Sequence, residues 1–169
     1  MQLNHSGPST PASPINEDCC RIFRRDMKQL YLLSLLLTGE ERSAERCFRA
    51  SLEDCMGLRP ALQQWTTAWT RRIILQNAIQ MLRPSADGAT SASQPKSGPL
   101  RTRLHPALRD VLQLGLFERF VFVISVLEGY SDHECSVLLR STCQHVIASK
   151  IKALQQLVRA SRQSPAMFA

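Results

Sequence analysis

The sequence has few aromatic residues and no long apolar run. Aromatic residues make up 6% of the 169 positions, so a core must be built mainly from aliphatic side chains. The longest apolar run, LYLLSLLL at 30–37, is far shorter than the roughly 18 residues of a membrane-spanning helix. No basic segment followed by an apolar one opens the chain, which argues against a secretion signal. We therefore expect a cytoplasmic protein without membrane insertion.

Motifs that carry catalysis or bind cofactors are also missing. The chain has no C-x-x-C pair, no glycine-rich phosphate loop and no nucleophile elbow. Three of the six cysteines fall where a helix pattern requires a small buried side chain: Cys47, Cys55 and Cys135. The alternative is a metal site made of His133, Cys135, Cys143 and His145. Its spacing matches no common zinc module, so we expect no metal, no cofactor and no enzyme activity.

Positive charge is in excess, which bears on the kind of partner. Lysine and arginine number 21 against 14 aspartates and glutamates, for a formal net charge of +7. This balance favours a polyanionic partner, either nucleic acid or an acidic protein surface.

Two stretches rich in serine and proline divide the chain. Residues 1–16 and 84–104 lack apolar periodicity, which indicates a disordered tail and a flexible linker. They leave two units, 17–83 and 105–160, with a short tail at 161–169. Neither unit shows the alternation of apolar and polar residues that strands require. The sequence therefore predicts an all-α protein of two small helical modules joined by a flexible linker.

The N-terminal unit is predicted to contain three helices. The first covers about 18–37 and stops at Thr38-Gly39, after which Thr38 and Glu41 have the spacing of a capping box. The second helix has an apolar face made of Ala44, Cys47, Phe48, Leu52 and Cys55. The third begins near Pro60 and stops at MLRP, 81–84.

The C-terminal unit begins with a short helix at about 106–113 and a second helix that carries a buried stripe. The stripe consists of Phe117, Phe120, Val121, Ile124 and Leu127. Gly129 can take the left-handed conformation that closes this helix. Ser131 and Glu134 then have the spacing of a capping box, so a new helix starts almost at once.

The order of helices after Gly129 is that of a helix-turn-helix. A helix of about two turns, 132–139, is followed by a tight turn and a longer helix at about 143–158. The inner face of the long helix is predicted to hold Val146, Leu154, Leu157 and Val158. In a helix-turn-helix the first helix braces the second, which enters the major groove. A plain antiparallel helical bundle has the same periodicity and is the alternative.

Four segments carry a resemblance to a known family. LLLTGEERSAERCFRASLED (35–54) and WTRRIILQNAIQML (69–82) resemble the second conserved region of bacterial RNA polymerase sigma factors. FERFVFVISVLEGYSDHECSVLL (117–139) and V-x-x-x-K-x-K-A-L from Val146 resemble the fourth region. Two such regions with a variable linker and no third region form the layout of the extracytoplasmic-function group.

The resemblance implies a sigma factor that binds core RNA polymerase, delivers it to promoter DNA and helps to start transcription. Family members are often held inactive by an anti-sigma factor. The implied polymerase-binding residues are Glu45, Arg46, Arg49 and Glu53. The implied DNA-binding residues are Arg71, Arg72, Gln76, Asn77 and Gln80 in one helix, and Gln144, His145, Ser149, Lys150 and Lys152 in the last. Cations of this kind hold phosphates, and amides can pair with base edges.

Some positions depart from the family pattern. Arg46 stands where acidic residues are usual, Arg140 where a glycine is usual in the turn, and Ile147 with Ser149 where cations are common. Fewer cations mean fewer phosphate contacts. The alternative function is therefore a diverged sigma-like regulator that acts by protein contact and does not initiate transcription.

Overall fold

The computed structural model describes residues 14–57, 67–84 and 104–163. Within these ranges the regular structure is entirely helical and contains no strand, which confirms the all-α prediction. None of the helices in these ranges is both long and apolar enough to cross a membrane. The predicted helix start near Pro60 and nearly all of the predicted linker lie outside the described residues.

The N-terminal half contains α1 (Pro14–Arg25), α2 (Met27–Thr38), α3 (Glu41–Gly57) and α4 (Thr67–Leu82). α1 begins inside the predicted tail. The single helix predicted for 18–37 is instead two helices that meet at Asp26. The Asp26 carboxylate accepts hydrogen bonds from Arg25 Nε at 2.9 Å and from Thr67 Oγ1 at 3.0 Å. A side-chain hydrogen bond therefore connects the break between α1 and α2 to the start of α4. The spacing of apolar residues, from which one helix was predicted, does not show such a bond.

The corner between α2 and α3 forms at Gly39, and it differs from the predicted capping box. Thr38 is the last residue of α2, and its hydroxyl donates to the carbonyl oxygens of Ser34 and Glu40 at 2.8 and 3.3 Å. Gly39 has φ +76°, and its N–H donates to the Leu35 carbonyl. Because Gly39 closes α2 in the left-handed conformation, the next helix begins only at Glu41, and Thr38 is too early to cap it.

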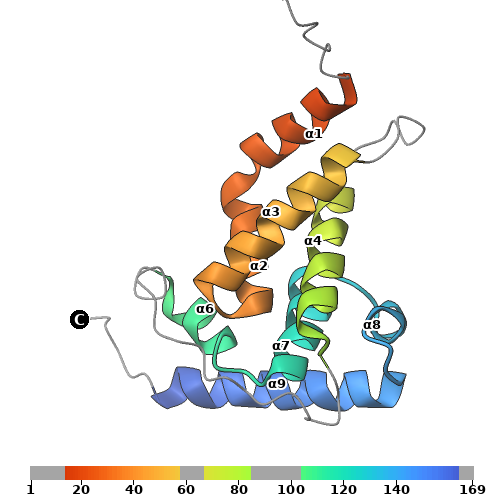
Figure 1. The fold of residues 1–169 in the computed structure, drawn as a ribbon. Coiled ribbons are helices and arrows are strands. Elements are labelled where there is room, and N and C mark those ends of the chain that lie inside the picture. The colour runs from red at the N-terminus through yellow and green to blue at the C-terminus, as the bar shows by residue number, and fades with distance from the viewer. Residues whose placement is uncertain (1–13, 58–66, 85–103, 164–169) are drawn as a thin grey trace, which may run out of the picture.

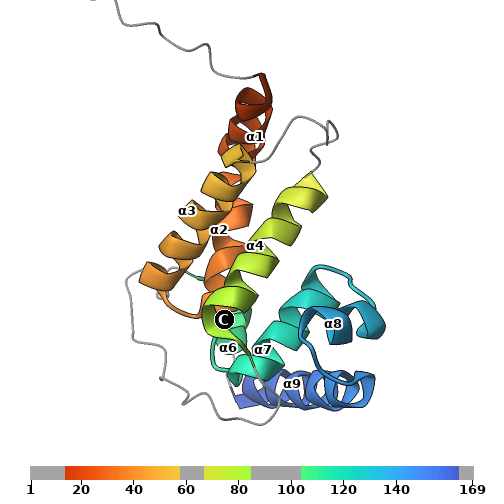
Figure 2. The ribbon, with the colours of Figure 1, turned by 45° about the vertical axis from the view of Figure 1, so that its right-hand side comes forward.

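The C-terminal half contains α6 (Pro106–Val111), α7 (Leu116–Phe122), a π-helical segment η1 (Val123–Leu127), α8 (Asp132–Leu138) and α9 (Cys143–Gln163). α9 thus continues into the predicted C-terminal tail. Figure 1 and Figure 2 show α9 lying across one end of the bundle, with α1 at the opposite end.

The predicted buried stripe of this half is correct at Phe117, Phe120, Val121 and Ile124, all of which are buried, but wrong at Leu127, which is 46% exposed. The change to π-helical winding at Val123, where the Glu128 N–H donates to the Val123 carbonyl, accounts for the error. An i→i+5 turn holds more residues than an α-turn, so Leu127 is rotated off the stripe.

One continuous core joins the two halves. Leu30, Leu37 and Ile74 from the N-terminal half belong to the same buried cluster as Phe120 and Val146 from the C-terminal half. Burying apolar surface is the main stabilising contribution to folding. In this structure the two predicted modules therefore pack directly against each other and share one apolar interior.

Two cysteines lie deep in this core, and we expect them to resist alkylation. Burial raises the pKa of both the Cys47 and the Cys135 thiol to about 11, so the reactive thiolate is scarce at pH 8. Brief treatment with iodoacetamide, followed by peptide mass spectrometry, should modify the half-buried Cys143 and leave these two intact. In denaturant all three should react. Equal rates for Cys47 and Cys143 in the folded protein would contradict the buried placement.

Candidate nucleic-acid interface

The short helix α8 begins with a complete capping box. The Ser131 hydroxyl accepts the Glu134 N–H at 3.2 Å, and the Glu134 carboxylate accepts the Ser131 N–H at 2.8 Å. The Ser131 hydroxyl also donates to the Glu134 carboxylate, at 2.7 Å, and this hydrogen bond, together with the one from the Ser131 N–H, lowers the pKa of Glu134. Gly129 before the box has φ +75°. The predicted closing glycine and the predicted cap are both confirmed, and they set the sharp corner before α8.

The turn from α8 to α9 is closed by Arg140, which takes the left-handed conformation with φ +50°. The Thr142 hydroxyl then accepts the His145 N–H at 3.2 Å and caps α9. Gln144 and His145 lie on the first turn of α9 and are exposed. These are the positions at which a recognition helix meets base edges in helix-turn-helix proteins.

Farther along α9, the predicted cations are paired with carboxylates. Lys150 is half-buried, and its ammonium donates to Asp132 at the start of α8. Lys152 donates to Glu118 on α7. Ser149, between the exposed face and the core, is also half-buried. The two lysines therefore brace α9 against the rest of its own half, and their charge is largely neutralised by these partners.

The outward face of α9 is apolar. Its exposed side chains Ile147, Ile151, Leu154 and Val158, here called the α9 stripe, are 41–50% exposed and recur at spacings of four, three and four. The predicted inner face is wrong at Leu154 and Val158. The buried line instead contains Val146 and Ala153, with Leu157 partly buried. A small residue at 153 lets α9 lie close to α7, and this rotates the larger side chains outward.

On α4, three of the predicted DNA-binding residues form an exposed row. Arg72, Gln76 and Gln80, here called the α4 row, are separated by four residues each and are all exposed. Side chains at this spacing share one face of a helix. The row therefore presents one guanidinium and two amides in a line along α4.

The other two predicted residues of α4 make contacts inside the protein. Asn77 Nδ2 donates to Asp54 Oδ2 at 2.7 Å and to Ser51 Oγ at 3.2 Å, which ties α4 to α3. Arg71 Nε donates to Glu128 Oε2 at 2.8 Å. Burial raises the pKa of Glu128, whose side chain is 7% exposed, while Arg71 opposes that rise. Arg71 thus holds a buried carboxylate of the C-terminal half.

The predicted polymerase-binding residues lie together on α3. Glu45, Arg46, Arg49 and Glu53 are all exposed. The spacing of 45, 49 and 53 places those three side chains on one face of the helix. Neighbouring buried residues of α3, such as Ala44 and Cys47, face the core. The four charged side chains therefore form a continuous outward surface.

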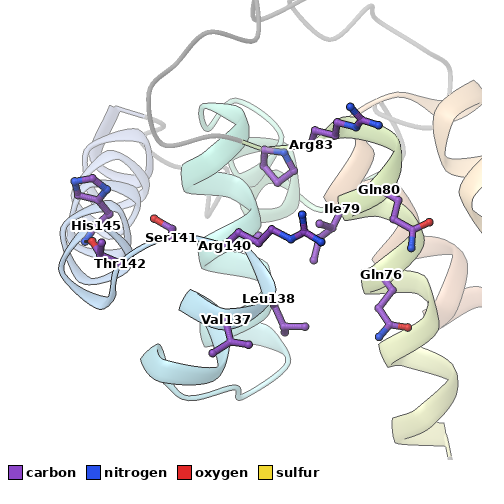
Figure 3. A pocket seen from close by; sticks show the side chains of 12 residues that line it. Gln76, Ile79, Gln80, Arg83, Val137, Leu138, Arg140, Ser141, Thr142 and His145 are labelled. Atoms are coloured by element: carbon purple, nitrogen blue, oxygen red, sulfur yellow. Dashed lines mark hydrogen bonds between the residues drawn. The ribbon is translucent and has the colours of Figure 1, made fainter.

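A cleft of about 1410 Å³ lies between α4 and the α8–α9 turn. It is lined by predicted residues from both halves, namely Gln76 and Gln80 on one side and His145 on the other (Figure 3). Arg83 and Arg140 also line it, although neither was among the predicted sites. The sequence already marks Arg140 as an arginine where the family usually has a glycine, and in the structure it takes the left-handed conformation that a glycine would take.

The alternative of a metal site is not supported by side-chain positions. Within the three described ranges no three histidine, cysteine or carboxylate side chains are grouped so as to hold a metal ion. Cys135 is fully buried, as its place in the helix pattern predicted.

The sequence matches no described protein family, and no curated protein matches it either.

Proposed function

We propose that the protein is a sigma factor of the extracytoplasmic-function type, which binds core RNA polymerase and directs it to promoter DNA. The observation that carries this proposal is the α8–α9 corner. A capped two-turn helix and a tight turn present the polar first turn of α9 outward. The segments that resemble sigma factors fall on α2–α4 and on α7–α9, in the family's order.

The chemistry of the exposed side chains supports contact with DNA. Arg72 of the α4 row offers a sequence-independent contact to a phosphate. Gln76 and Gln80 of the row, and Gln144 of α9, carry amides that can make paired hydrogen bonds to a base edge. Of the ten DNA-binding candidates, the exposed ones that form no ion pair among the described residues are suited to base and phosphate contact: Arg72, Gln76, Gln80, Gln144 and His145. Lys152 is exposed as well, but it is paired with Glu118.

The proposal also implies a rearrangement. The α4 row and the first turn of α9 face the same cleft, whereas a sigma factor reads two promoter elements that lie far apart on the duplex. The two halves must therefore separate when the protein binds polymerase. Contacts between them, such as the Arg71–Glu128 pair, would be exchanged for contacts with polymerase and DNA.

The test is reconstitution with core RNA polymerase from the host bacterium. The protein should co-elute with core polymerase at moderate salt, and the complex should give run-off transcripts from fragmented genomic DNA. Sequencing those transcripts would define the promoters. Neither co-elution nor transcripts above the level of core polymerase alone would reject the proposal.

Charge reversal on α3 should separate polymerase binding from folding. In the variant R46E/R49E, we expect affinity for core polymerase to rise by about tenfold or more, because acidic residues are usual in the family on this surface and the polymerase surface that meets them is then of opposite charge. The helix content should be unchanged, since both side chains are exposed. R109E/R162E, at two exposed positions on α6 and α9, makes the same change in net charge and is the matched control, which should bind normally. Equal affinity of both variants would remove this surface of α3 from the polymerase interface.

A second candidate function rests on the α9 stripe. Four large apolar side chains on the exposed face of a recognition helix are unsuited to phosphates and are typical of protein contact. The pairing of Lys150 and Lys152 with carboxylates weakens DNA attraction further. A sigma-like regulator that binds a protein through α9 would bind core polymerase or another protein and give no transcripts in the same reconstitution.

A further inference from the structure

Within the described ranges, two residues other than glycine have a positive φ angle, and both lie at the cleft between α4 and the α8–α9 turn. Arg83, just after α4, has φ +44°, and Arg140, just after α8, has φ +50°. Only glycine takes this left-handed region without cost, and another residue is disfavoured there by roughly 1–2 kcal/mol. Strained residues of this kind gather at binding sites more often than elsewhere. Both arginines line the same cleft.

The two guanidiniums have no counter-charge. Neither forms an ion pair or side-chain hydrogen bond within the described part of the chain. Among the described residues that line the cleft, the charged side chains are those of the two arginines, and none is a carboxylate. Arg140 extends from its turn toward α4 (Figure 3). Two exposed arginines around one hollow raise its positive potential, and a guanidinium binds phosphate through two parallel hydrogen bonds.

The remaining walls of the cleft have a different character. Ile79, Val137 and Leu138 give it an apolar surface, and Val137 is 64% exposed. Gln76 and Gln80 add amides from α4. At the α8–α9 turn, the buried Ser141 hydroxyl is the side-chain polar atom in the described ranges that has no hydrogen-bond partner. An apolar wall with a few polar groups is the usual composition of a small-molecule site.

We propose that this cleft binds a free nucleotide. The guanidiniums of Arg83 and Arg140 hold its phosphates, the apolar wall takes one face of the base, and the amides of Gln76 and Gln80 pair with the base edge. The cleft is open, and its volume of about 1410 Å³ exceeds the roughly 300–1,000 Å³ of typical ligand pockets, so it has room for a nucleoside triphosphate that stays partly exposed to solvent. The proposal does not depend on the proposed function, because its evidence is the cleft alone.

A bound nucleotide would also connect the two halves. Arg83 follows α4 of the N-terminal half and Arg140 lies in the α8–α9 turn of the C-terminal half. A ligand that contacts both binds only when they are packed together, so it stabilises that arrangement by mass action. The nucleotide would thereby compete with any partner that needs the halves apart.

The experiment uses the full chain and isothermal titration calorimetry at about 150 mM salt, where weak surface attraction is screened. ATP, GTP, CTP and UTP are titrated separately, with inorganic triphosphate as a probe of the phosphate site alone. We expect saturable binding of one nucleotide per chain, with at least one base binding more tightly than triphosphate. Absence of saturable binding for all four nucleotides overturns the proposal.

The variant R140G tests the site without endangering the fold. Glycine relieves the left-handed strain, so the melting temperature should stay equal or rise, while nucleotide affinity falls by about tenfold or more. R159A, on the exposed face of α9, removes the same charge outside the cleft and should leave affinity within about twofold. Equal losses in both variants would show general charge attraction and overturn the proposal.

The same chemistry occurs in a nucleic-acid strand, and a further arm separates the two sources. Short single-stranded oligonucleotides are titrated into the wild type, R140G and R72A. A free-nucleotide site predicts that R72A binds ATP or GTP as the wild type does, since Arg72 does not line the cleft. Binding of oligonucleotides alone, lost equally in R72A and R140G, would assign the cleft to a strand and overturn the proposal.

Discussion

Replacing Phe120 with alanine is expected to lower the free energy of unfolding by about 3–5 kcal/mol. Phe120 on α7 is fully buried and is the largest fully buried side chain in the described ranges. It belongs to the core cluster that contains Leu37 of α2 and Ile74 of α4. Truncation leaves a cavity in this shared core that neighbouring side chains refill only in part. The measurement is urea unfolding followed by circular dichroism.

Tryptophan fluorescence would show whether the N-terminal half unfolds together with the rest of the protein. Both tryptophans lie in the N-terminal half of the sequence, and Trp69 packs against the core. If the halves unfold together, fluorescence and circular dichroism give coincident transitions, and F120A shifts both. V126A, at an exposed site just after the same helix, is the control and should change stability by less than about 0.5 kcal/mol. A fluorescence transition that F120A leaves in place would mean that the halves fold independently.

Replacing Arg119 with alanine is expected to cost about 2–4 kcal/mol. Arg119 on α7 is buried, and its Nε donates to the Leu37 carbonyl at 3.3 Å, at the end of α2. A cation at the C-terminal end of a helix is stabilising because it is attracted to the partial negative charge of the helix dipole. Alanine would leave both a cavity and an unsatisfied carbonyl at the joint between the halves. Chemical unfolding again provides the measurement.

Arg119→Lys is the informative companion variant. A methyl group placed at Gly39 would come within 2.9 Å of Arg119 Nη1, so the flat guanidinium lies directly against the backbone of that glycine. A lysine ammonium is a compact charge without this planar shape, and we expect R119K to recover less than half of the lost stability. Full recovery by lysine would show that charge alone, rather than the packed guanidinium, holds the joint.

The substitutions of Arg119 also bear on the proposed function. A sigma factor whose halves must separate has to disrupt the shared core and the Arg119 contact, and polymerase binding must supply that free energy. R119A lowers the cost of separation and should therefore favour the polymerase-bound form. Stability of the free protein and affinity for polymerase would then move in opposite directions.

The parts of the fold that sequence predicted are those determined by residues close in the chain. Ser131 and Glu134 cap α8 through hydrogen bonds across three residues, and the left-handed Gly129 before them depends only on its missing side chain. The similar spacing of Thr38 and Glu41 failed because Gly39 ends α2 between them. The spacing alone does not show where the preceding helix stops.

The parts that sequence could not predict depend on residues far apart in the chain. The DNA contact implied for Arg71 stays a prediction, and the structure adds a partner from the other half, Glu128, that the sequence did not indicate. Lys150 is named from the sequence only as a DNA-binding candidate, and in the structure its ammonium reaches Asp132. No periodicity identifies such partners, because each pair forms only after the helices have packed.

The π-helical segment 123–127 places a length constraint on the chain just before the α8–α9 corner. Each residue of an α-helix adds about 100° of rotation about the helix axis. Because an i→i+5 turn holds more residues than an α-turn, deleting a single residue here would restore ordinary α-helix and would shift Gly129 and everything after it relative to the core. Side-chain substitutions at the exposed Val126 and Leu127 can be absorbed, those at the buried Val123 and Ile124 cannot, and insertions or deletions would aim α8 and α9 in a different direction.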